Sequence, residues 1–269
     1  MLRYGVRAGP VRAPARAGAP DRPAVRVDAV SSDPVTIAID GPSGSGKSSV
    51  SQVVATELGL AYLDTGAMYR ALAWWCADQG IDLADLDRVA GAARDFPLRL
   101  GTDPRHPTVH VGRSDVGQAI RTTQVSAVVS QVATNLAVRE AMRTRQRDLI
   151  AAAREQGAGI VVEGRDITTV VAPDAEHRIL LSASEEARLL RRSRELFATD
   201  HPDAVEATRD HVVRRDRDDA TVSAFFEPAE GVVGIDTSDL TLSQAVEVVL
   251  RVVTVGADSD RRAADSTHP

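Results

Sequence analysis

A glycine-rich run that contains one lysine offers the clearest chemistry in this chain. The run from Gly41 to Ser48 reads G-x-x-x-x-G-K-S, the spacing of a phosphate-binding loop. Its glycines let the backbone N–H groups point at one spot, and a following helix N-terminus adds roughly half a positive charge. Lys47 would reach the β- and γ-phosphates of a nucleotide, and Ser48 would be a ligand of Mg²⁺.

Lys47 is the only lysine of the sequence, because the other basic residues among the 32 are all arginine. Such a bias is typical of a GC-rich genome, so a retained lysine indicates a position where arginine does not serve. A compact ammonium fits inside a loop that wraps a phosphate, whereas a broad planar guanidinium does not. The alternative is a Gly/Ser-rich turn that matches by chance, but the loop, its flanks and the lysine all agree.

The segments around this run predict the fold. A β-rich segment, 35–39, precedes it, and 49–58 can follow as an amphipathic helix, so the loop lies between a strand and a helix. Strands alternate with helices along the rest of the chain, which predicts an α/β fold of three layers with a central parallel sheet. Further strands are expected at 60–64, 159–163, 178–183 and 232–236.

Helices and a small β unit fill the connections. Residues 96–112 alternate like a hairpin around Asp103-Pro104, which predicts a small β-containing insert. The helix expected over 120–154 has a possible break near Thr134-Asn135. The other helices are expected at 65–79, 82–94, 185–197, 204–219 and 242–253.

Charged residues follow the strand at 159–163. Ligands of open α/β sheets gather at the carboxyl ends of the strands, which makes Glu163, Arg165 and Asp166 candidates for a site. The two arginine-bearing helices, 185–197 and 204–219, bracket a loop near 200–203. They are either a solvated charged face or a helical lid that closes over a triphosphate. We favour the lid, because phosphoryl transfer needs positioned positive charge.

The amino-acid composition limits the kinds of partner that the protein can be expected to bind. A hydrophobic fraction of 43% supports a real core, and a net charge of −6 argues against a general nucleic-acid surface. Cys76 is the only cysteine, so no internal disulfide is possible, which fits a reducing cytoplasm. No apolar run approaches the roughly 20 residues of a membrane span. We therefore expect a cytoplasmic protein with no nucleic-acid or membrane partner.

Both ends of the chain are expected to be disordered tails. Residues 1–33 combine scattered arginines with Ala, Gly and Pro and have no apolar periodicity. We interpret them as a disordered tail or as the result of a start codon placed too early, with an organelle transit peptide as the alternative. Residues 256–269 are polar, and we expect them to be a second disordered tail.

Several blocks of the sequence resemble bacterial cytidylate kinases, the (d)CMP kinases of the nucleoside monophosphate kinase group. The similarity runs from about Val35 to Val253. The phosphate-binding loop is shared by many families, whereas the blocks 64–70 and 163–166 together are specific to this one. The matching blocks are 39–48, 63–70, 120–122, 130–133, 138–139, 163–166 and 215–216.

The resemblance implies a role for each matching residue. It implies transfer of the ATP γ-phosphoryl group to CMP or dCMP with Mg²⁺ bound through Ser48, by a monomer in which Lys47 and Arg165 are catalytic. The ATP-binding residues would be Gly41, Pro42, Ser43, Gly44, Ser45, Gly46, Lys47, Ser48 and Ser49. The CMP-binding residues would be Thr65, Arg70, Ser130, Arg139, Arg165, Asp166 and Asp219, and the lid arginines Arg188, Arg192 and Arg215.

Within the CMP site, Arg70 and Arg165 would hold the phosphate, and Ser130, Arg139 and Asp166 would read the cytosine. The residue chemistry agrees, because a carboxylate accepts the cytosine amine and arginine donates to its ring acceptors. The kinase domain would cover 34–255, with a monophosphate-binding part at about 66–120 and a lid at about 190–225.

One motif departs from the family pattern. The family lid ends in R-D-x-x-D-x-x-R, and Asp219 matches the carboxylate expected to meet the ribose hydroxyls. Val222 stands where the family has its final arginine, a phosphate ligand. Arg214 or Arg217 could substitute for it. The segment 225–228, Phe-Phe-Glu-Pro, also departs from the pattern.

Two other classes of function fit a phosphate-binding loop. A GTPase needs an N-K-x-D guanine motif, and the only lysine is already in the loop. A scaffold that binds nucleotide without turnover would not need Lys47, Ser48 and the arginine set together. Among kinases, UMP is the nearest alternative acceptor.

Overall fold

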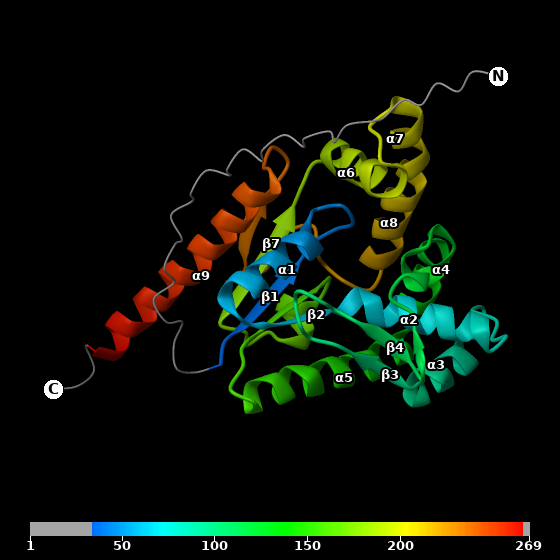
Figure 1. Ribbon diagram of the computed structural model, residues 1–269, viewed down its shortest axis with the longest axis horizontal. Helices are drawn as coiled ribbons and strands as arrows, with labels where there is room; N and C mark the ends of the chain where they lie inside the picture. Colours follow the sequence, from blue (N-terminus) through cyan, green and yellow to red (C-terminus); the bar gives the residue numbers. More distant parts are fainter. Residues whose placement is uncertain (1–33, 266–269) are drawn as a thin grey trace, which may run out of the picture.

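The computed structural model describes residues 34–265, although the side chains of 210–211 and 255–265 are not described. A five-stranded parallel sheet forms the centre, in the order β2-β6-β1-β7-β8 (Figure 1). The predicted α/β fold with a central parallel sheet is therefore confirmed. The strands are β1 Thr36–Asp40, β2 Ala61–Asp64, β6 Ile160–Gly164, β7 His177–Ser182 and β8 Val233–Asp236.

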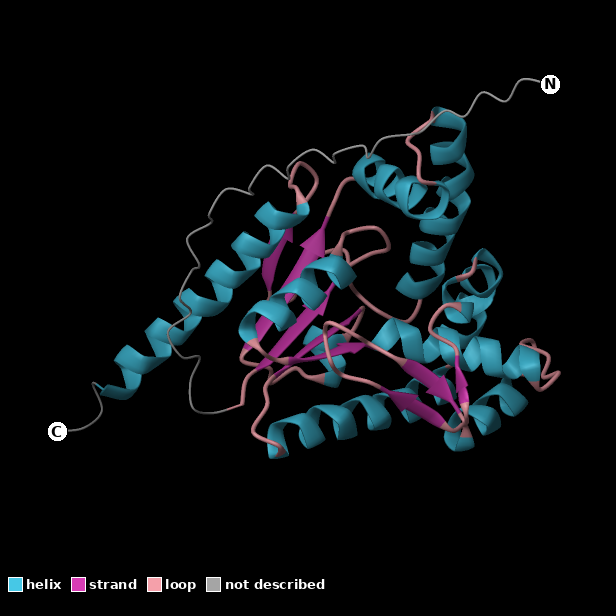
Figure 2. Ribbon diagram, in the orientation of Figure 1, coloured by secondary structure: helices cyan, strands magenta, loops and turns pink. Residues whose placement is uncertain are grey.

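Helices cover both faces of this sheet (Figure 2). Alternate residues of the central strand enter different hydrophobic cores, since Ile37 and Ile39 belong to one and Ala38 to the other. A strand buried on both faces needs a continuous apolar sequence, which explains the run 35–39. The first core includes residues of α1 Lys47–Leu58 and α9 Leu242–Asp265, and the second includes residues of α2 Thr65–Asp78 and α5 Leu136–Glu155.

The carboxyl ends of three neighbouring strands, β2, β6 and β1, bring three carboxylates to the same end of the sheet. The strand register places Asp40 beside Gly164 and Asp64 beside Glu163. The glycine-rich loop leaves β1 at this end. Helix α2 begins at it directly after β2, because Asp64 accepts a hydrogen bond from the N–H of Ala67 at 2.9 Å. This end of the sheet therefore positions the start of both helices.

The predicted small β insert is present as a three-stranded antiparallel sheet, β3-β4-β5. Its third strand was not predicted, because two residues give no periodicity. Helix α3 begins at Leu86, where Asp85 caps it, so the prediction that it begins at Asp82 is wrong. The elements are α3 Leu86–Asp95, β3 Leu98–Leu100, β4 Val109–Val111, β5 Ser114–Asp115 and the 3₁₀ turn η1 Ala119–Arg121.

The predicted helix break near Thr134-Asn135 is confirmed. Helix α4, Thr123–Ala133, ends there, and α5 begins at Leu136. The Asn135 side chain accepts hydrogen bonds from the N–H groups of Ala137 and Val138, which satisfies two otherwise free donors at the start of α5.

The arginine-bearing segment forms helices α6, Glu185–Phe197, α7, Pro202–Arg209, and α8, Arg215–Ala220. The predicted break after residue 197 is confirmed, and Pro202 opens α7, a position where its missing N–H costs nothing. A five-residue π turn, Asp210–Arg214, joins α7 to α8. The prediction of one regular helix over 204–219 is wrong in that respect.

Two further elements differ from the predictions. A π turn, η2 Ile167–Val171, follows β6 and was not predicted. Helix α9 runs to Asp265, so the prediction that it ends at Val253 is wrong, and the tail expected from 256 is helical that far. Residues 257–265 contain no glycine or proline, which allows the helix to continue. None of the described helices is long and apolar enough to cross a membrane.

Candidate active site

The glycine-rich loop connects β1 to α1 through two left-handed glycines. Gly46, the N-cap of α1, has φ 87°, and Gly44 has φ 78°. A β-carbon on Gly44 would lie 2.8 Å from the carbonyl oxygen of Arg188, so the loop packs closely against α6. The sequence motif therefore corresponds to a tight loop that opens at the N-terminus of a helix.

Lys47 is the first residue of α1, and its side chain folds back over the loop. Its Nζ lies 3.4 Å from the carbonyl oxygen of Pro42. Burial and then the charge of Arg165 lower the pKa of Lys47 from 10.5 to about 8. A bound anion would offset both effects, because it stabilises the charged ammonium. The position of Lys47 thus favours binding of a negatively charged group.

Arg70 lies on α2 and faces the same site. It pairs with Asp64 at 2.7 Å, and its Nε is buried without a hydrogen-bond partner among the described residues. Burial is the largest single effect and opposes the charge of Arg70, but Asp64 and Glu163 together with the hydrogen bond to Asp64 raise its pKa. An unsatisfied buried donor costs about 1–3 kcal/mol. An oxyanion in the site would satisfy it.

Glu163 is the penultimate residue of β6 and is 1% exposed. The hydroxyl of Tyr62 donates a hydrogen bond to it at 2.7 Å. Burial first, and then the charge of Asp64, raise the pKa of Glu163. Its position after a buried strand made it a candidate, but sequence reasoning gave it no role.

Arg165 joins the sheet edge to the loop and to α8. Its Nη1 donates to the carbonyl oxygen of Gly41 at 2.9 Å, and its Nε pairs with Asp219 at 2.5 Å. Its Nη2 lies 3.2 Å from Asp216. The predicted catalytic arginine thus contacts both the phosphate-binding loop and the expected ribose-binding carboxylate.

Asp216 is a central residue of the site that sequence reasoning missed. It is 3% exposed, accepts a hydrogen bond from the N–H of Ser43 at 3.0 Å, and pairs with Arg188 as well as Arg165. The signal available was its place beside Arg215 in the lid motif. Its partners lie far away in the sequence, so their identity could not be read from the motif.

Two of the three residues expected to read cytosine, Arg139 on α5 and Asp166, lie in contact. Asp166 Oδ2 lies 2.6 Å from Arg139 Nη2 and 3.1 Å from Arg143 Nη2. Arg139 also donates to the hydroxyl of Ser223 at 2.7 Å and to the carbonyl oxygen of Ala133 at 3.0 Å. Two guanidinium groups therefore hold one oxygen of Asp166. Arg143 was not predicted, because only the fold brings it to this carboxylate.

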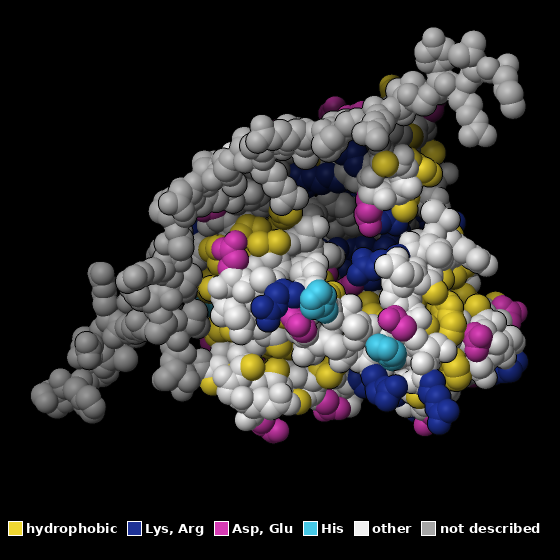
Figure 3. Space-filling view, in the orientation of Figure 1, with side chains coloured by type: hydrophobic (Ala, Val, Ile, Leu, Met, Phe, Trp, Pro, Cys, Tyr) yellow, Lys and Arg dark blue, Asp and Glu magenta, His cyan; other side chains and the backbone are white. Residues whose placement is uncertain are grey.

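A cavity of about 600 Å³ joins these groups. Lys and Arg side chains gather in the recess beneath α6 and α8 (Figure 3). Most of the predicted site residues line this cavity, namely Ser43, Gly44, Ser45, Gly46, Lys47, Ser48, Ser49, Thr65, Arg70, Arg139, Arg165, Asp166, Arg192, Arg215 and Asp219.

Four predicted residues do not line it. Gly41 and Pro42 contribute carbonyl oxygens behind the loop, to Arg165 and Lys47. Ser130 is nearly buried on α4, next to Val129, which does line the cavity. Arg188 lies behind the loop and donates to the carbonyl oxygen of Ser43 at 3.1 Å, so it supports the loop from outside the cavity.

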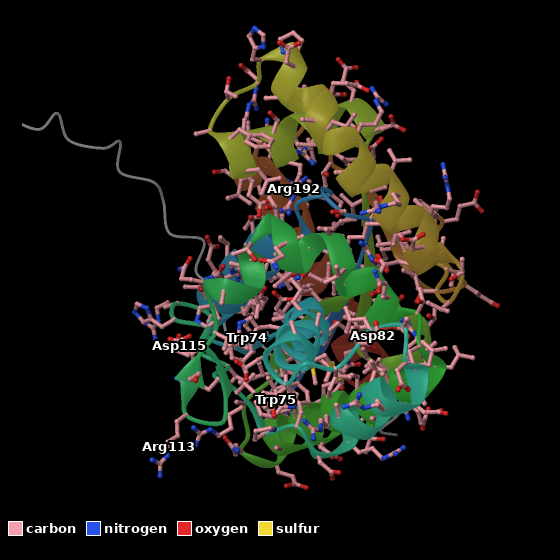
Figure 4. All side chains as sticks on the ribbon, turned by 90° about the vertical axis from the view of Figure 1, so that its right-hand side faces the viewer. Trp74, Trp75, Asp82, Arg113, Asp115 and Arg192 are labelled. Carbon is pink, nitrogen blue, oxygen red and sulfur yellow. The ribbon has the colours of Figure 1, made fainter. Side chains whose placement is uncertain are left out.

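Helix α6 of the predicted lid and the turn η1 supply more arginines to the cavity than were predicted. Arg192 lies between the lid helices and the glycine-rich loop (Figure 4). Arg191 donates to the hydroxyl of Thr237 at 3.0 Å and to the carbonyl oxygen of Ser45 at 3.4 Å. Burial, followed by the charge of Arg165, lowers the pKa of Arg215 to about 10. The unpredicted cavity arginines are Arg121, Arg191 and Arg194.

Neither candidate substitute for the missing lid arginine lines the cavity. Arg214 is exposed, and its Nη2 lies 3.4 Å from the carbonyl oxygen of Ala127. Arg217 is also exposed. The positive charge of the cavity therefore comes from other arginines.

The parallel sheet, the glycine loop at its edge and the arginine-lined cavity define a P-loop kinase. A sequence model of the family described as "Cytidylate kinase" matches residues 37–255, and the chain belongs to this family. It is 47% identical over 220 residues to the cytidylate kinase of Streptomyces avermitilis, covering 81% of this chain and 92% of that one. It is 48% identical to that of Cutibacterium acnes, covering 84% and 99%. The predicted family and the prediction of an enzyme are confirmed.

Proposed function

We propose that this chain transfers the γ-phosphoryl group of ATP to CMP or dCMP and releases ADP with CDP or dCDP. The observation that carries the proposal is the single cavity that joins Lys47 to the pair Arg139 and Asp166. One end offers a loop and an ammonium for a triphosphate, and the other offers a carboxylate and guanidinium groups for a base. Such a cavity supports direct transfer between two nucleotides bound end to end.

At the donor end, the loop N–H groups and Lys47 bind the β- and γ-phosphates of ATP. The hydroxyl of Ser48 lines the cavity and can serve as a ligand of Mg²⁺. The described residues contain no group of three His, Cys, Asp or Glu that could hold a metal ion by themselves. That fits Mg²⁺ that arrives with ATP, since this ion commonly takes few protein ligands and keeps water and phosphate oxygens. It would neutralise charge on the phosphates.

At the acceptor end, Arg70 and Arg165 hold the CMP phosphate so that one of its oxygens attacks the γ-phosphorus of ATP. The bond from that phosphorus to the β-phosphate oxygen breaks, and ADP leaves. The unpaired Nε of Arg70 supports this role. Asp219 meets the ribose, Thr65 lies near the acceptor nucleotide, and Ser130, Arg139 and Asp166 read the cytosine.

Steady-state kinetics with ATP, Mg²⁺ and a panel of monophosphates tests the proposal. We expect CMP and dCMP to be used well, UMP poorly, and AMP and GMP hardly at all. Lys47→Ala should lower kcat by several orders of magnitude in a folded protein, because positioned cations stabilise the transferring group. Binding of ATP without ADP release would favour a scaffold. Near-normal turnover by Lys47→Ala would refute the role of the loop.

A further inference from the structure

The segment that follows α8 holds an aromatic ring against the phosphate-side arginine. The guanidinium carbon of Arg165 lies 4.6 Å from the centre of the Phe225 ring. The same segment contacts the base-side arginine, because Ser223 accepts a hydrogen bond from Arg139 at 2.7 Å. This segment begins at Val222, where the family pattern has an arginine. The stretch 223–225 thus contacts two arginines of the site, and Phe225, which departs from the family pattern, contacts Arg165.

Phe225 is not explained by packing in the core. It is 1% exposed and among the largest fully buried side chains of the described chain. Within that part of the chain, it belongs to neither hydrophobic core of the sheet. Its ring lies against Arg165 and against the half-exposed Phe226, whose ring centre is 4.7 Å away. A buried ring outside both cores therefore lies against a charged group.

Three of the five N–H groups at the edges of the Arg165 guanidinium are already held, which leaves two for the acceptor phosphate. Gly41, Asp219 and Asp216 each take one of its three nitrogens, at 2.9, 2.5 and 3.2 Å. These contacts lie in the guanidinium plane and leave its flat faces free. An aromatic ring attracts a cation through the negative face of its π system, which an aliphatic side chain of similar bulk does not do. Phe225 covers one face in this way.

We propose that Phe225 is a positioning residue, which fixes the plane of the Arg165 guanidinium against the loop for binding and transfer to the acceptor phosphate. The inference rests on the proposed function, since that function gives Arg165 the acceptor phosphate. The ring acts through Arg165 and does not touch the base. Phe225 therefore affects kcat/KM for the acceptor nucleotide and leaves the preference for CMP over UMP unchanged.

The test compares Phe225→Leu with phenylalanines carrying one, two or three ring fluorines at position 225. Fluorine withdraws charge from the ring face with little change in size, so folding is preserved while the attraction weakens. We expect kcat/KM for CMP to fall stepwise with fluorine number, and by about threefold to tenfold in Phe225→Leu. KM for ATP and the UMP:CMP ratio should stay unchanged. The same substitutions at Phe226 are the matched control.

Equal kinetics across the fluorine series would overturn the inference, as would a loss at position 226 as large as that at 225. So would a Phe225→Leu protein that melts earlier but keeps wild-type kcat/KM. If the wild type itself did not use CMP, the proposed function would fail instead. The wild-type control therefore separates the two failures.

Discussion

Lys47 shows how one residue type can be singled out by chemistry. The cavity contains many arginines, whose charge persists at any physiological pH, but Lys47 has a pKa lowered to about 8 by burial and then by Arg165. Its charge in the empty site is therefore sensitive to pH, whereas bound phosphates would hold it protonated. Binding of a nucleotide at alkaline pH then takes up a proton.

This linkage predicts the pH dependence of ATP affinity. Above pH 8 the free protein loses the Lys47 proton and the complex keeps it, so the dissociation constant for ATP should rise with pH. We expect ATP to bind roughly tenfold more weakly at pH 9 than at pH 7.5. Calorimetric titration with ATP, without an acceptor nucleotide, measures the dissociation constant at each pH. Lys47→Arg should bind weakly and without this slope, because its charge does not titrate there; a flat wild-type profile would contradict the assignment.

The position of Asp166 leads to a prediction about which base the enzyme selects. UMP presents a carbonyl and a ring N–H where CMP presents an amine and an acceptor, so the carboxylate of Asp166 would face a carbonyl oxygen. Asp166→Asn can donate to that carbonyl. We expect this variant to lose most of its CMP turnover, while its UMP:CMP ratio of kcat/KM rises at least about tenfold. Arg139 should keep the reversal incomplete.

Steady-state kinetics with both nucleotides measures that ratio. Asp174→Asn, an exposed carboxylate outside the cavity, is the matched control. Because Asp166 also pairs with Arg139 and Arg143, melting temperatures must accompany the kinetics. Equal losses for CMP and UMP would mean that Asp166 supports the geometry of the site and does not read the base.

Among the elements, α8 joins α6 in connecting the predicted lid segment to the glycine-rich loop. Asp216 on this helix takes the N–H of Ser43 and the side chains of Arg165 and Arg188. Buried charges are costly unless they are paired, so each partner depends on this carboxylate. The short helix therefore contributes to the shape of the phosphate-binding loop, although it lies more than 160 residues after it.

Asp216→Asn should therefore destabilise the domain and loosen the loop. Asparagine can still accept from Ser43, but it leaves Arg188 without its counter-charge and leaves Arg165 with Asp219 alone. We expect the free energy of unfolding to fall by about 2–4 kcal/mol. Urea unfolding measures it, and faster hydrogen exchange at Ser43 should accompany it. The control is Asp218→Asn, on the same helix and without a side-chain partner in the described structure. It should change neither the free energy of unfolding nor the hydrogen exchange at Ser43. Equal stabilities for the two variants would contradict the prediction.

Local signals made most elements predictable. The break before α5 could be predicted because Asn135 is a strong cap, and the buried run before Lys47 predicted β1. The π turns and the third strand of the insert were missed, because one extra residue per turn or a two-residue strand leaves no period in the sequence. Most site residues within motifs were predicted. Arg143 lies outside the motifs, and the role of Asp216, although it lies in one, depends on pairings that only the folded chain creates.

At the scale of the whole molecule, side chains from other parts of the described domain hold the start of the central strand, β1. Thr36 begins β1, and its N–H donates to Glu176 at 2.8 Å. Arg154 donates to the hydroxyl of Thr36 and to Glu176, both at 2.9 Å. Side chains from elsewhere in the domain, Glu176 and Arg154, therefore satisfy polar groups at the start of the central strand.

Residues 1–33 lie outside the described residues, and their composition gives no apolar pattern to bury. We predict that removal of residues 1–32 leaves kcat/KM for CMP and the melting temperature almost unchanged, because β1 is anchored by Glu176 and Arg154. Removal of residues 1–38 should instead abolish folding, since it takes half of the central strand and its pairing with β6 and β7. Thermal unfolding and turnover of the two truncations measure the contrast. A fall of more than a few degrees in the shorter truncation would mean that the N-terminal segment contributes to the stability of the domain.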